Sequence, residues 1–177
     1  ITFDLDTAPD FSSGESSADY AVPLGVLSSS TVTHSDGSSI RMIVAEADTN
    51  AAGGMVVTIM NANGSNGLVS TSAPSDNINS STNSMSAGNE NYGLCVATSG
   101  LTGFSRASPY DSGTCSLGSG GNAVKVLSTS PTNILNSGGA PLSGGHAEIV
   151  VNASISPTTP AHNDYTDELT FIATGTF

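Results

Sequence analysis

Three histidines, His34, His146 and His162, are the side chains of this sequence best suited to acid–base chemistry near neutral pH. His34 precedes Ser35-Asp36-Gly37 and His162 precedes Asn163-Asp164, and both sequences are typical of turns. The many serines offer a nucleophile, but the chain contains no Gly-x-Ser-x-Gly, no P-loop and no His-Glu-x-x-His motif. We therefore expect the turn histidines to lie in solvent, and we expect no catalytic residues and no enzymatic activity.

Carboxylates are the second group with possible chemistry. They gather near the two ends of the sequence, with Asp4, Asp6 and Asp10 in one group and Asp164, Asp167 and Glu168 in the other. If the terminal segments pair, these oxygens converge, and oxygen ligands suit Ca²⁺. No EF-hand spacing is present, so solvated carboxylates on exposed strand faces are the alternative, and we expect no other cofactor.

Two cysteines, Cys95 and Cys115, form an even pair in a chain whose composition is typical of secreted surface proteins. We expect one disulfide that closes a loop rich in Gly and Ser. Two buried free thiols are the alternative. Neither a Cys-x-x-Cys motif nor a nearby pair of histidines supports a zinc site.

Charge excludes several classes of partner. The chain of 177 residues has 15 acidic residues and three lysines and arginines, which gives a formal net charge of −12. Nucleic-acid binding and attachment to anionic membranes both need basic residues, so we expect neither. No apolar stretch approaches the length of a membrane span, and we expect no membrane insertion of the mature form. Residue 1 is not a methionine, so we expect an exported protein whose leader has already been removed.

Both ends of the sequence alternate apolar and polar residues with a period of two, which predicts strands with one buried face. At the N-terminus Ile1, Phe3 and Leu5 alternate with polar residues. Near the C-terminus the apolar face consists of Tyr165, Leu169, Phe171 and Ala173, and it also includes Asp167. Between these ends no window shows convincing helical spacing.

Strands are predicted at about residues 1–6, 19–27, 39–47, 54–61, 92–98, 122–128, 146–156 and 165–177, with Ser70–Glu90 as the most loop-like segment. Glycine-containing turns separate them. Short, regularly punctuated strands predict one all-β domain over residues 1–177, an Ig-like or jelly-roll-type β-sandwich with Greek-key connections and long polar loops.

The C-terminal pattern of Tyr165, Asp167, Leu169 and Phe171 after a proline-containing connector resembles the last strand of spore-coat-U-like and archaic chaperone–usher pilin domains. The N-terminal Ile-Thr-Phe-Asp-Leu, together with Val22-Pro-Leu-Gly-Val-Leu, is similar to mature camelysin-type subunits of biofilm fibres. In both families an incomplete β-sandwich accepts an extended strand from its neighbour. The resemblance implies a filament subunit that is joined to copies of itself by donor-strand exchange.

The first strand leaves two interpretations open. Ile1, Phe3 and Leu5 either serve as a donor strand, within residues 1–6, that adds to the edge of another subunit, or form the first strand of a monomeric sandwich. We expect an extracellular structural subunit of a filament or pilus on the cell surface, with roles in biofilms and adhesion. The alternatives are a monomeric Ig-like adhesin or binding module, or a surface-layer component.

Overall fold

The computed structural model describes residues 1–12, 20–37 and 41–177, and these residues form an almost entirely β structure. The prediction of an all-β sandwich is confirmed. One short 3₁₀ turn, Gly64–Asn66, accompanies the strands. The strands are β1 (Thr2–Ala8), β2 (Thr33–His34), β3 (Met42–Thr49), β4 (Met55–Asn61), β5 (Leu68–Ser70), β6 (Asn77–Ile78), β7 (Asn83–Ser84), β8 (Asn91–Thr102), β9 (Ser105–Arg106), β10 (Ala123–Val124), β11 (Thr132–Asn136), β12 (Leu142–Ser154), β13 (Tyr165–Thr166) and β14 (Leu169–Gly175).

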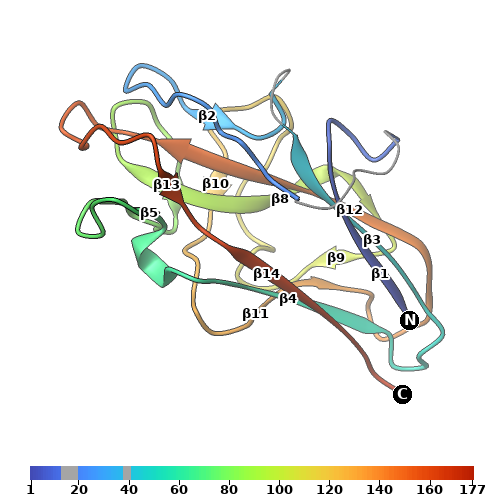
Figure 1. The fold of residues 1–177 in the computed structure, drawn as a ribbon. Coiled ribbons are helices and arrows are strands. Elements are labelled where there is room, and N and C mark those ends of the chain that lie inside the picture. The colour runs from blue at the N-terminus through green and yellow to red at the C-terminus, as the bar shows by residue number, and fades with distance from the viewer. Residues whose placement is uncertain (13–19, 38–40) are drawn as a thin grey trace.

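Two larger antiparallel sheets make up the sandwich (Figure 1). In the first, β12 is central: it pairs with β8 along one edge and with β3 and β2 along the other, and β1 continues the sheet beyond β3. The second has the order β14-β4-β11-β9. The strands nearest the two chain ends, β1 and β14, are therefore edge strands of different sheets, and both termini lie at one end of the molecule (Figure 1).

The main core lies between these two sheets. Alternate residues of β12 face it, namely Ala147, Ile149, Val151 and Ala153, and they are all buried. Met55, Val57 and Ile59 of β4 face them from the opposite sheet. The period-two alternation in the sequence thus places these apolar residues on the side of each strand that faces the opposite sheet, as the sandwich requires.

Several predicted strands need correction. Residues 20–27 of the predicted strand 19–27 form no strand, because Pro23 has no N–H to donate and Gly25 has a φ of 69°; residue 19 lies outside the described residues. Residues 39 and 40 of the predicted strand 39–47 also lie outside them, and β3 begins at Met42. The predicted strand 122–128 is reduced to β10, and the predicted strand 165–177 divides into β13 and β14.

β11 was missed in the sequence because it lacks alternation. Its adjacent residues Ile134 and Leu135 are both fully buried. The register of β11 against β4 shifts between Asn133 and Leu135, as at a β-bulge. A bulge places an additional residue on one strand and so allows two consecutive apolar residues to reach the core.

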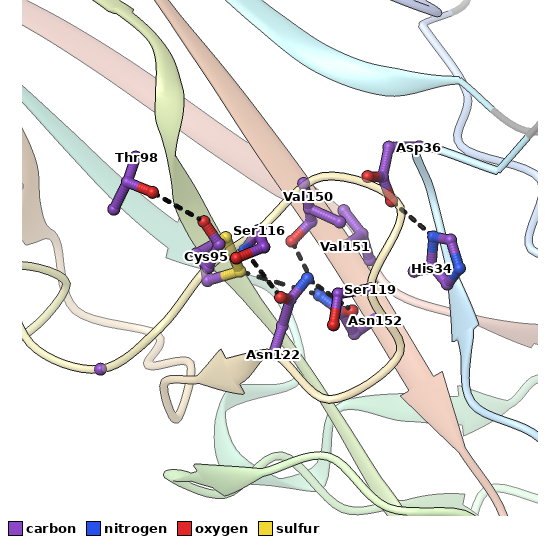
Figure 2. Close-up of a disulfide and its surroundings, with 12 residues drawn as sticks. His34, Asp36, Cys95, Thr98, Ser116, Ser119, Asn122, Val150, Val151 and Asn152 are labelled. Atoms are coloured by element: carbon purple, nitrogen blue, oxygen red, sulfur yellow. Dashed lines mark hydrogen bonds and ion pairs between the residues drawn. A yellow bond between two sulfur atoms is a disulfide. The ribbon is translucent and has the colours of Figure 1, made fainter.

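A second, smaller apolar cluster covers the outer face of the first sheet and includes the disulfide. Cys95 of β8 is bonded to Cys115, as the sequence predicts, and both residues are buried beside Val150 and Val44. Figure 2 shows the loop that follows Cys115 lying over β8 and β12. The Cys115 carbonyl accepts hydrogen bonds from the backbone N–H of Thr98, at 3.2 Å, and from its hydroxyl, at 3.3 Å. The disulfide therefore fixes an otherwise irregular loop onto the sheet.

Replacing both Cys95 and Cys115 with Ala is expected to lower the free energy of unfolding by about 3 kcal/mol, because the open loop gains conformational freedom in the unfolded chain. Urea denaturation measures the change. Thr98→Val, which removes one hydrogen bond to this loop, is the matched control and is expected to cost about 1 kcal/mol. Equal stability of the double variant and the wild type would contradict a structural role for the disulfide.

Candidate functional site

The joint between β1 and β3 is the candidate functional site. β1 pairs antiparallel with β3 from Thr2, opposite Asp48, to Ala8, opposite Met42, without a register shift. Among the described strands β3 is its only partner. In the single chain β1 thus completes its own sheet, which is the second of the two interpretations of Ile1–Leu5.

The side chains of β1 divide between the two faces as the sequence predicts. Phe3 and Leu5 are partly buried and pack against the main core. Ile1 differs, since 57% of it is exposed, although its side chain lies against Gly175 of β14. A Cβ at position 175 would collide with it, so the glycine makes room for this contact. The joint between β1 and β3 is therefore apolar on the side that faces the core, and Ile1 at its N-terminal end is largely exposed.

On the outer face of the same joint, three carboxylates lie together. Oxygen atoms of Asp4, Asp6 and Glu46 all lie within 4.8 Å of one another. Asp4 and Glu46 are directly opposite in the register of β1 and β3, and like charges in that position repel. These residues have the oxygen ligands that Ca²⁺ prefers. Sequence analysis found the two aspartates but missed Glu46, because only the register of β3 places it there.

Asp164 and Asp167 do not join this group, since β14 pairs with β4 and not with β1. Asp164 accepts hydrogen bonds from Ser70, Thr71 and Ser72, which hold the pKa of its carboxyl below its usual value. Burial raises the pKa of Asp167, although the Asn61 side chain and the Asn63 backbone N–H donate hydrogen bonds to it. Both carboxylates organise local loops, so the predicted convergence of the two acidic groups is wrong.

The C-terminal apolar residues line a groove at the open side of the sandwich. Tyr165, Leu169 and Phe171 are partly buried there, as their alternation predicts. The groove has a volume of about 1250 Å³ and also contacts Leu5 of β1. The segment 20–27 lies along it and packs Val22, Leu24 and Leu27 against the core without forming strand pairs.

Just after β1, the chain makes a contact that sequence analysis missed. The ring of Phe11 stacks on the imidazole of His146, with 3.6 Å between centroids and 8° between planes. The backbone N–H of Phe11 donates to the carboxylate of Glu148 at 3.1 Å. One signal was present in the sequence, because Phe11 is an isolated aromatic residue in a polar stretch.

The other two histidines are not free in solvent, which corrects the expectation from their turn sequences. His34 Nδ1 lies 2.6 Å from the carboxylate of Asp36, and His162 Nε2 lies 2.7 Å from that of Asp76. Each imidazole is only about one-fifth exposed, at 22% and 23%. Within the described part of the chain, no hydrogen bond joins either ring to a serine hydroxyl, so neither pair is part of a triad.

Comparisons with known proteins do not identify a family for this chain. No family model, no curated protein and no solved structure matches the chain. Within the described residues, no helix is long and apolar enough to cross a membrane.

Glu46→Gln is expected to raise the free energy of unfolding by about 0.5 kcal/mol in buffer with chelator, because it removes like-charge repulsion across β1 and β3. Thermal melting at low ionic strength measures it, since salt screens the effect. Glu168→Gln, an exposed carboxylate outside the cluster, is the control. If the three carboxylates bind Ca²⁺, Glu46→Gln becomes less stable than the wild type when Ca²⁺ is added. A variant that is less stable than the wild type in chelator would contradict the repulsion.

Proposed function

We propose that this protein is a structural subunit of an extracellular filament, and that its subunits are joined by exchange of β1. The observation that carries the proposal is the position of β1, an edge strand with one apolar face whose only partner among the described strands is β3. When β1 leaves β3, it exposes a full strand edge, and the same strand of another copy fits that edge. Each subunit then donates β1 to one neighbour and receives β1 from another.

Exchange conserves the interactions of the joint. A neighbour's β1 makes the same antiparallel register with β3 and buries Phe3 and Leu5 against the same core. Such an exchange from subunit to subunit is heterologous and does not close, so it produces a linear polymer.

Two further observations support a filament outside the cell. The disulfide fits an oxidising compartment. The resemblance of the terminal strands to camelysin-type and spore-coat-U-like subunits points to the same mode of assembly. We infer a function in the surface matrix, such as biofilm or adhesion, rather than catalysis.

A covalent lock on β1 tests the proposal. Thr2 and Asp48 are opposite each other at the start of the joint. The double variant Thr2→Cys, Asp48→Cys, oxidised as a dilute monomer, ties β1 to its own β3 and is expected to yield folded monomers that do not polymerise. Size-exclusion chromatography and negative-stain microscopy measure the loss.

The control mixes copies that carry Thr2→Cys alone with copies that carry Asp48→Cys alone. Exchange between chains predicts covalent dimers of the two variants on a non-reducing gel. Polymerisation of the locked variant at the wild-type rate, or monomeric wild-type protein at every concentration, would refute exchange of β1.

A binding module is the second candidate, and the groove of about 1250 Å³ favours it. Its apolar lining suits an extended apolar peptide rather than a charged ligand. If the wild type stays monomeric and such a peptide protects the protein against thermal unfolding, the groove is a binding site. Leu24→Asp is expected to weaken that protection.

A further inference from the structure

The donor segment in the proposed exchange does not end with β1. Ala8, the last residue of β1, is opposite Met42 of β3, and Phe11 follows only three residues later. Three residues of extended chain span at most about 11 Å. If Phe11 stays docked after exchange, it therefore docks on the copy that holds its β1, because a three-residue connection keeps it close to that strand.

The site that Phe11 occupies is on the outer face of the first sheet. His146 and Glu148 stand two residues apart on β12 and so share one face, and each interacts with Phe11. Glu148 is only 5% exposed, and its other carboxylate oxygen lies against Gly100 of β8. A Cβ at position 100 would be 1.8 Å from that oxygen, so the glycine leaves space for the buried carboxylate.

The chemistry of the site fits an aromatic residue that follows a strand. The imidazole provides a flat surface for a ring, and stacked aromatic pairs contribute beyond the area they bury. The buried carboxylate accepts a backbone N–H, and hydrogen bonds to charged groups are among the stronger ones. His146 Nδ1 is buried and, in the described residues, has no hydrogen-bond partner, and the Phe11 ring stacks on the imidazole.

We propose that Phe11 is a second anchor of the donor segment, and that in the filament the site formed by His146, Glu148 and Gly100 receives Phe11 of a second copy of this chain. This inference rests on the proposed exchange of β1 and extends the donor from β1 to residues 1–11. The joint then engages both faces of the acceptor's first sheet. Phe3 and Leu5 pack inside it, and Phe11 packs outside.

Full-length Phe11→Ala tests the anchor. Its filaments are expected to release subunits on dilution about tenfold faster than wild-type filaments, a difference that corresponds to about 1.4 kcal/mol in the barrier for each joint. The free-subunit concentration is expected to stay the same, because the free subunit loses the same contact. Phe11→Tyr retains the ring and is expected to behave as the wild type. The matched control is Leu117→Ala, in the loop that follows Cys115. Leu117 is an apolar residue with 38% of its surface exposed, which is close to the 41% of Phe11.

A crosslink identifies which copy fills the site. Copies with Phe11→Cys are assembled with copies that carry His146→Cys, and mixed covalent dimers are expected on a non-reducing gel. Normal filaments without mixed dimers, or an unchanged rate of subunit release for Phe11→Ala, would overturn the anchor while leaving the exchange of β1 intact. Failure of the wild type to form filaments would instead overturn the proposed function itself.

Discussion

The outer edge of β3 is the constraint on which the rest of the first sheet depends. A strand edge carries N–H and C=O groups that need hydrogen-bond partners, and a long unpaired edge tends to pair with a strand of another chain. β12 pairs with one edge of β3, and among the described strands only β1 pairs with the other. β1 also closes one side of the main core with Phe3 and Leu5. The subunit is therefore complete only when a strand with the sequence of β1 occupies this position, whether it comes from the same chain or from another.

Sequence alternation predicted the strands that have one face in the core and failed elsewhere. β1, β12 and β14 were found because their core-facing apolar residues recur with period two. β11 was missed because a bulge sends consecutive residues into the core. Residues 20–27 were part of the predicted strand 19–27, and Val22 and Leu24 do pack against the core, but Pro23 and Gly25 prevent the backbone from pairing. In this segment apolar side chains indicated burial correctly and backbone pairing incorrectly.

The candidate site was predictable only in part, and for a related reason. Asp4 and Asp6 follow from the pattern of β1, but Glu46 joins them through the register of β3, which no local pattern encodes. Phe11 and Glu148 are 137 residues apart in the sequence. Their contact depends on how the chain turns after β1, and it requires a glycine at position 100 on a third segment. A contact among residues of three separate segments cannot be predicted from the pattern of any one segment.

Charge and exchange together determine when such a subunit can polymerise. Copies with a net charge of −12 repel each other, so their surfaces do not favour association at low ionic strength. Backbone pairing and apolar burial hold the exchanged strand in the joint, and salt affects these interactions little. The joint formed between chains has the same contacts as the joint within one chain, so the energy of the strand itself does not favour the polymer. What favours it is the concentration of subunits and any contact made only between them. Release of β1 and Phe11 from their own chain must come first, and the stability of that intramolecular joint therefore sets the barrier to assembly.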